Sequence, residues 1–100
     1  MPTSATTKVQ LRNPDPKKKG PRMDKATYGV VRRAALATLP ATGKGLTLEE
    51  FRSKLATRLG RTKGWDPTLS AQWYGMAIKL DLEARGQLTR SGSPQRLTRA

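Results

Sequence analysis

Basic side chains gather in three parts of this sequence, and their chemistry is suited to binding phosphates. Ammonium and guanidinium groups bind phosphate oxygens through charge-assisted hydrogen bonds. Any one of them more often only keeps a small domain soluble, but together they predict contact with several phosphates of a nucleic acid. The candidate residues are Lys17, Lys18, Lys19 and Arg22 near the start, Arg61 and Lys63 in the middle, and Arg90 and Arg96 around the turn at 91–94.

Two further polar residues, Gln72 and Lys79, share one face of a predicted helix with Gly75. Glutamine can bind adenine through two hydrogen bonds, and lysine can contact guanine or phosphate. Two long polar side chains are few for a helix that reads bases. We therefore expect phosphate contacts to dominate, with Gln72 and Lys79 as candidate groove contacts.

Catalytic chemistry has few candidates here. The chain has no cysteine and no histidine, which removes thiolate and imidazole metal ligands and the usual general base. Asp81 and Glu83 stand two apart on a predicted helix and do not face each other, while Asp81 and Arg85 have the spacing of an ordinary surface ion pair. Segment 41–45 lacks two residues that a phosphate-binding loop requires. We expect no enzyme, metal site or cofactor.

The net charge supports a phosphate-bearing partner. The 100 residues include 20 Lys and Arg against 7 Asp and Glu, a formal net charge of +13. Solubility of a small domain needs a net charge of only about 2–8. No segment approaches the ~20 apolar residues of a membrane span, and the first residues lack the apolar core of a signal peptide. The sequence predicts a cytoplasmic protein without membrane contact.

Two helices have clear start signals. Asp24 is suited to the N-cap of a helix over 25–38. Thr47 and Glu50 have the spacing of a capping box for a helix over 48–59. Each helix repeats apolar residues every three or four positions, so each should pack one face on a common core.

A third helix is predicted over 67–85, with Asp66 as N-cap and Gly86 just after its end. It is apolar on more than one side, so we expect one side to be core and the other to be covered by another element or by a second subunit. The predicted core stripe comprises Leu69, Trp73, Met76, Ala77, Leu80 and Ala84. The predicted partner or homodimer surface comprises Tyr74, Ile78 and Leu82.

Residues 87–98 complete the pattern as a terminal β-hairpin around a turn rich in Gly, Ser and Pro. Residues 46–47, or a short strand at 9–12, could supply a third strand. The sequence thus predicts a mainly α protein with a small β-hairpin, an α+β winged helix-turn-helix-like fold. Residues 1–22 form a basic, largely flexible arm, and residues 23–100 form the domain.

Several short motifs match a known group of proteins. They are Trp73-Tyr74, the run from Lys79 to Gly86, Pro94 to Leu97, Leu11 to Pro14, and Gly45 to Thr47. On these motifs the chain resembles, over residues 9–98, an uncharacterised family of small bacterial proteins with a winged-helix-like domain. The resemblance implies that fold, and the family has no assigned activity or binding residues to carry over.

Three functions remain open from the sequence. The leading hypothesis is binding of double-stranded DNA through backbone phosphates by a basic wing and loop, as in a transcriptional regulator. The alternative is a protein-interaction or dimerisation module that uses the apolar flank of the third helix. The second alternative is binding of structured RNA, because charge alone does not separate RNA from DNA.

Overall fold

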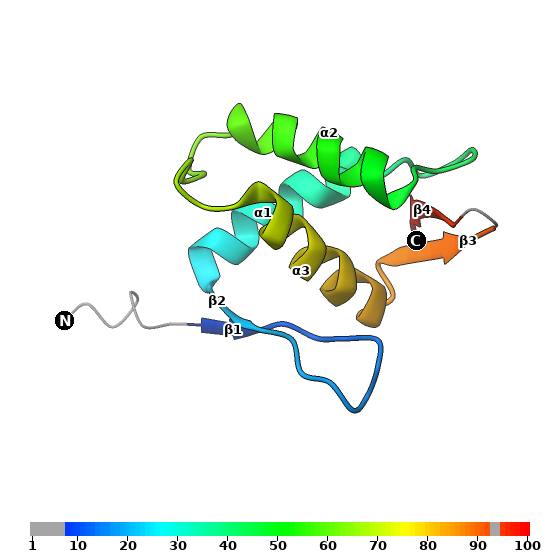
Figure 1. Cartoon of the computed structure of the whole chain (residues 1–100), viewed down its shortest axis with the longest axis horizontal. Helices are drawn as coiled ribbons and strands as arrows, with labels where there is room; N and C mark the ends of the chain where they lie inside the picture. Colours follow the sequence, from blue (N-terminus) through cyan, green and yellow to red (C-terminus); the bar gives the residue numbers. More distant parts are fainter. Residues whose placement is uncertain (1–7, 93–94) are drawn as a thin grey trace.

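The computed structural model describes residues 8–92 and 95–100, so Ser93 and Pro94 of the predicted turn, and residues 1–7 of the arm, lie outside it. The fold is α+β, with the three predicted helices and the predicted C-terminal hairpin, and it is consistent with a winged-helix-like layout (Figure 1). A second small antiparallel hairpin, near the start of the chain, was not predicted. The elements in chain order are β1 (Lys8–Gln10), β2 (Arg22–Asp24), α1 (Lys25–Thr38), α2 (Leu48–Gly60), α3 (Ala71–Ala84), β3 (Leu88–Ser91) and β4 (Arg96–Arg99).

The first two helices begin where their capping residues predict. The Asp24 carboxylate accepts backbone N–H bonds at the start of α1, whose bounds match the expected 25–38. The capping box of α2 is complete, because the Thr47 hydroxyl accepts from Glu50 N at 3.1 Å and the Glu50 carboxylate accepts from Thr47 N at 2.9 Å. Local capping chemistry therefore determines both starts.

The start of α3 differs from the prediction of residue 67. Asp66 folds a turn of its own, in which its carboxylate accepts from Thr68 N at 2.9 Å. The N-cap of α3 is Ser70, whose hydroxyl accepts from Trp73 N at 3.1 Å. An Asp before Pro is compatible with either a turn or the start of a helix, and in this structure it forms a turn.

The main core lies on the opposite side of α3 from most of the predicted stripe, of which Ala77 is buried. Ile78 and Leu82 are fully buried, while Trp73 is 51% exposed. Gly75 is buried where α3 packs on α2, and a Cβ there would lie 3.4 Å from a methyl group of Leu55. Because Ile78 and Leu82 belong to the core, the prediction that they form a partner surface with Tyr74 is wrong. The remaining members of the main core cluster are Val31, Ala34, Ala35, Leu39, Phe51, Leu55, Leu59, Leu88 and Leu97.

The C-terminal hairpin of β3 and β4, here called the wing, is joined to the helices by a third short strand segment. Leu46 and Leu97 form an antiparallel bridge, in which Leu46 N donates to Leu97 O at 2.9 Å. Leu88 and Leu97 are buried and anchor the wing on the core. Of the two candidates for the third strand, the segment at Leu46 is the one that joins the wing.

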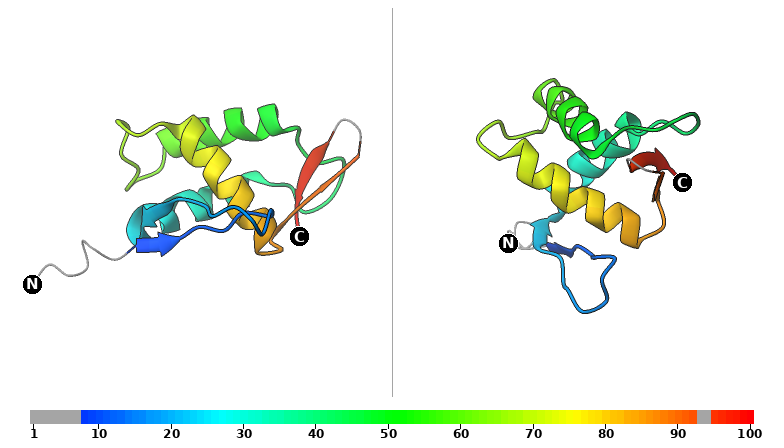
Figure 2. Two further views of the ribbon diagram at one scale, coloured as in Figure 1. Left: turned by 60° about the horizontal axis from the view of Figure 1, so that its bottom comes forward. Right: turned by 45° about the vertical axis from the view of Figure 1, so that its right-hand side comes forward.

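The N-terminal hairpin, which comprises β1, β2 and the loop between them, packs on the helices at a different edge from the wing (Figure 2). Val9 pairs with Met23 in its antiparallel register. Leu11 and Met23 are buried and form a second small core cluster with Ala77 of α3. The sequence placed the start of the folded domain at residue 23, and the structure adds the segment from β1 onward to the same folded unit.

Candidate nucleic-acid interface

The two predicted wing arginines both have carboxylate partners. Arg90 Nε lies 2.8 Å from Glu83 Oε2, and Arg96 Nη1 lies 3.6 Å from Glu50 Oε1. Their side chains remain 47% and 36% exposed. Exposed ion pairs of this kind contribute about 0–1 kcal/mol and exchange readily. The wing arginines are therefore oriented by the fold but remain accessible to a phosphate.

The segment between α2 and α3 presents Arg61 and Lys63 as exposed cations. Trp65 is half-buried beside them, with its ring edge-on to Tyr74 at 5.5 Å between centroids. Trp65 therefore packs back on α3 instead of offering a free stacking surface. The two cations stay in solvent close to the start of α3.

The two predicted groove contacts on α3 differ in their exposure to solvent. Gln72 is exposed near the start of the helix. Lys79 is 6% exposed, and its ammonium lies 2.8 Å from Glu83. The prediction that Lys79 faces outward is wrong, because the helix turns the face with Ile78 and Leu82 inward and takes Lys79 partly with it.

The basic residues of the predicted arm lie on the N-terminal hairpin. Lys17, Lys18 and Lys19 are exposed in its loop, and Arg22 is exposed on β2. Residues from separate parts of the sequence thus carry positive charge at the hairpin, at the wing and at the loop before α3.

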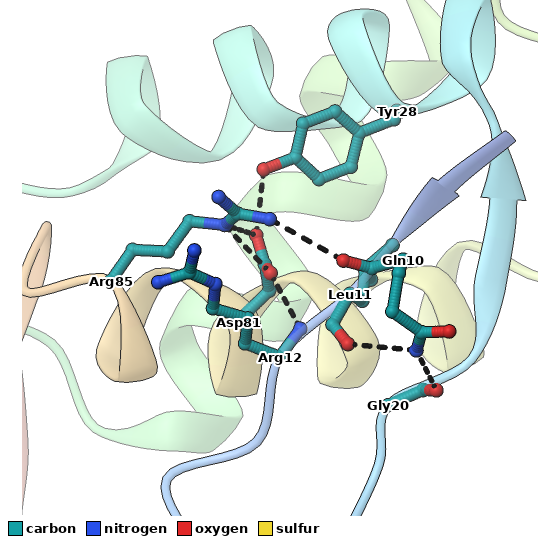
Figure 3. Close-up of polar contacts among 7 residues, drawn as sticks. All are labelled: Gln10, Leu11, Arg12, Gly20, Tyr28, Asp81 and Arg85. Carbon is teal, nitrogen blue, oxygen red and sulfur yellow. Dashed lines mark hydrogen bonds and ion pairs between the residues drawn. The ribbon is translucent and has the colours of Figure 1, made fainter.

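A buried carboxylate holds the N-terminal hairpin against the helices, as Figure 3 shows. Asp81 is 0% exposed and accepts from the Tyr28 hydroxyl at 2.7 Å, from Arg12 N at 2.8 Å and from Arg85 Nε at 2.9 Å. The Arg85 guanidinium also reaches the carbonyl oxygen of Gln10 at 3.4 Å. We call these groups the Asp81 cluster. The expected pair of Asp81 with Arg85 is present, but its carboxylate is buried.

The Asp81 cluster changes the acidity of two neighbours. Burial, together with the hydrogen bond to Asp81, raises the pKa of the Tyr28 hydroxyl above 10.0. The hydrogen bond to Asp81 also raises the pKa of the Arg85 guanidinium. Both shifts strengthen the existing protonation states of Tyr28 and Arg85, as expected for a structural anchor.

Most carboxylates of the chain are used by the fold itself. Six of the seven accept hydrogen bonds from caps, turns or buried cations: Asp15, Asp24, Glu50, Asp66, Asp81 and Glu83. Most Lys and Arg side chains, by contrast, are exposed. Because exposed cations greatly outnumber exposed carboxylates, the described surface carries a large positive charge.

A groove between the end of α1 and the outer side of α2 concentrates this charge. It encloses about 770 Å³ and its lining contains no carboxylate among the described residues. We call it the basic groove. Its lining residues are Thr38, Pro40, Leu46, Ser53, Lys54, Thr57, Arg58, Arg61 and Thr62. Of these, the sequence had singled out only Arg61; the row of cations at 54, 58 and 61, spaced for one helix face, was the signal that could have found the others.

The outer face of α3, defined as Gln72, Trp73, Met76 and Leu80, is mostly apolar. Trp73 is 51% exposed, and Met76 and Leu80 are partly exposed. In a helix-turn-helix this helix enters the major groove and presents polar side chains to bases. An apolar outer face is poorly suited to that contact.

Neither a metal site nor a membrane span appears in the described structure. Residues 8–92 and 95–100 contain no group of three or more His, Cys, Asp or Glu that could hold a metal ion. Within those same ranges, no helix combines the length and hydropathy that crossing a membrane requires.

The geometry defines a small, strongly basic α+β protein with a winged-helix-like layout. Residues 8–97 match the model of a family of unknown function, DUF6958, and the chain belongs to that family. Among functionally curated proteins and among solved structures, comparison found no match. The expected membership of an uncharacterised family is confirmed.

Proposed function

We propose that this protein binds nucleic acid, and double-stranded DNA in particular, through backbone phosphates. The observation that carries the proposal is the charge of the surface, where exposed Lys and Arg side chains greatly outnumber exposed carboxylates. Such a surface releases counterions from DNA when it binds, which drives association without base recognition. The proposal includes that the protein is bacterial, lies in the cytoplasm and assists transcriptional control.

The test is fluorescence anisotropy of a labelled random-sequence duplex DNA across a salt series. We expect a dissociation constant of about 10⁻⁴–10⁻⁶ M at physiological salt. A plot of the logarithm of the binding constant against the logarithm of the salt concentration should have a slope of about −0.9 for each phosphate contacted. Duplex RNA of equal length, added as competitor, separates DNA from structured RNA. The proposal fails if no binding occurs at low salt, and RNA replaces DNA as ligand if RNA displaces the label more effectively.

A second candidate function follows from the outer face of α3. Trp73 is exposed beside Met76 and Leu80, where a base-reading helix would have polar side chains. Aromatic residues and Met are enriched in protein interfaces, so this face suits a protein partner or a second copy of the chain. Sedimentation equilibrium of the wild type and of Trp73→Glu tests the second copy: a dimer that the variant abolishes supports it, and a monomer at all concentrations excludes it.

A further inference from the structure

We infer that the basic groove is a binding site for successive phosphates of a nucleic-acid strand. This inference rests on the proposed function and deepens it by assigning the contact to one place. The groove lies between the end of α1 and α2, on residues that neither the wing nor the outer face of α3 contains.

The first step is the chemistry of the lining. Lys54, Arg58 and Arg61 supply three cations, and the hydroxyls of four Ser and Thr residues surround them. Small-molecule pockets are lined predominantly by apolar and aromatic groups, whereas only Pro40 and Leu46 are apolar here. No carboxylate is among the described lining residues, although Lys54 also borders a neighbouring hollow that Glu49 and Glu50 line. The side chains of Lys54, Arg58 and Arg61 are exposed and can meet a polyanion.

The second step is the spacing of the cations. Lys54, Arg58 and Arg61 form one row along α2, and at about 1.5 Å per residue the row spans about 10.5 Å of helix axis. One strand of a duplex rises about 3.4 Å for each phosphate. The row is about three times that rise, so it is too long for a single phosphate and long enough to contact successive phosphates of one strand.

The third step is the preorganisation of Arg58. Its Nε donates to the Thr38 hydroxyl at 3.2 Å, and that hydroxyl donates to the carbonyl oxygen of Ala34 at 2.8 Å. This chain of hydrogen bonds fixes the guanidinium by its inner nitrogen. The two terminal nitrogens remain as a planar fork, the geometry that binds phosphate oxygens in bidentate fashion. Thr38 is thus a positioning residue.

The fourth step is the arrangement of the remaining hydroxyls. Thr57 and Thr62 donate to backbone carbonyls one turn earlier, at 3.2 and 2.7 Å. Their hydrogen atoms therefore point away from a ligand, so these two residues shape the groove without donating to it. The attraction is carried by the three cations.

The experiment compares two triple variants in the anisotropy salt series. Lys54→Ala/Arg58→Ala/Arg61→Ala removes the groove cations, and Lys8→Ala/Lys25→Ala/Arg33→Ala removes three exposed cations elsewhere. We expect the slope for the groove variant to be shallower than the wild-type slope by about 2.7, which corresponds to three phosphate contacts. When salt rises from about 50 to about 200 mM, the affinity of wild type should therefore fall about 40-fold more than the affinity of the groove variant. The control variant should change the slope by less than the value for one phosphate contact, which is about 0.9. Circular dichroism establishes that both are folded.

The outcomes separate the inference from the proposed function. If wild type does not bind DNA, both fail. If wild type binds with a steep slope and the two triple variants behave alike, DNA binding stands and the groove assignment is overturned. Inorganic tripolyphosphate is titrated as a competitor: displacement of DNA at equal phosphate concentration would assign the groove to small polyphosphates and also overturn it.

Two single variants test preorganisation. Arg58→Lys keeps the charge but loses the fork, so affinity should fall while the salt slope stays the same. Thr38→Val removes the acceptor of Arg58 Nε and should weaken binding in the same way, again with an unchanged slope. Wild-type affinity in both variants would show that the orientation of Arg58 is irrelevant.

Discussion

The carboxylate of Asp81 on α3 and the hydroxyl of Tyr28 on α1 are 2.7 Å apart, 53 residues distant in sequence. The same carboxylate accepts from Arg12 N, so one buried group joins α1, α3 and the N-terminal hairpin. Because each of its oxygens has partners, the cost of burying the charge is offset only while all of them are present.

Removal of this carboxylate should destabilise the whole protein. Asp81→Ala leaves the Tyr28 hydroxyl and Arg12 N without their acceptor, and loss of one partner from a buried pair costs about 3–5 kcal/mol. The partial exposure of Arg85, 27% for its side chain, favours the lower end. Urea unfolding of wild type and variant measures the difference. A change below about 0.5 kcal/mol, the size usual for surface substitutions, would contradict the anchoring role.

Alkaline pH should weaken the fold through Tyr28. Its pKa is raised in the folded state above 10.0 by burial and by Asp81, so the protonated form is the one that folding favours. The stabilisation that comes from protonated Tyr28 is fully present below pH 10. It is lost as the pH rises through the pKa of Tyr28 in the folded state. Tyr28→Phe removes the titrating group, so its stability should decline less between pH 9 and pH 11. Parallel pH curves for the two proteins would contradict this.

The two faces of α3 should respond to truncation by different amounts. Ile78 is fully buried, so Ile78→Ala should cost about 2–5 kcal/mol. Trp73 is 51% exposed, and Trp73→Ala should cost much less despite removing a larger side chain. Thermal unfolding compares them directly, since about 1 kcal/mol shifts the melting temperature by about 4–8 °C in a domain of this size. A larger loss of stability from Trp73→Ala than from Ile78→Ala would show that Trp73 belongs to the core.

Gly45 should be essential for attachment of the wing. Its φ is +79°, and a Cβ there would lie 2.6 Å from Leu97 O, inside the bridge that joins the wing to the helices. Gly43 is a matched control, because its φ is +88° but a Cβ there would meet nothing within 4 Å. Gly43→Ala should cost only the left-handed conformation, about 1–2 kcal/mol, and Gly45→Ala more. Hydrogen exchange at Leu97 N reads the bridge itself, and equal effects of the two substitutions would refute the clash.

Local signals predicted the fold better than they predicted the surface. Asp24 and the Thr47 capping box determine helix starts through contacts within three residues, so sequence reading found them. The inward face of α3 could not be found in that way, because apolar residues occupy two sides and only packing against α1 and α2 chooses between them.

Parts of the candidate sites depend on contacts between separate elements, which sequence spacing does not encode. Lys79 is buried by the same rotation of α3 that buries Ile78. The groove needs Thr38 of α1 next to Arg58 of α2, a pairing that exists only in the folded chain. Arg61 was found because a loop before a helix is a familiar place for a phosphate contact, whereas Lys54 and Arg58 look like ordinary helix surface.

The bond from Arg12 N to Asp81, which spans 69 residues, has a consequence for the order of folding during synthesis. An isolated two-stranded hairpin is only marginally stable in water, so β1 and β2 have little to hold them together when they leave the ribosome. At about 5–20 residues per second, their partner on α3 follows roughly 3–14 s later. The N-terminal hairpin therefore cannot complete its docking until α3 has emerged, although it is made before all three helices.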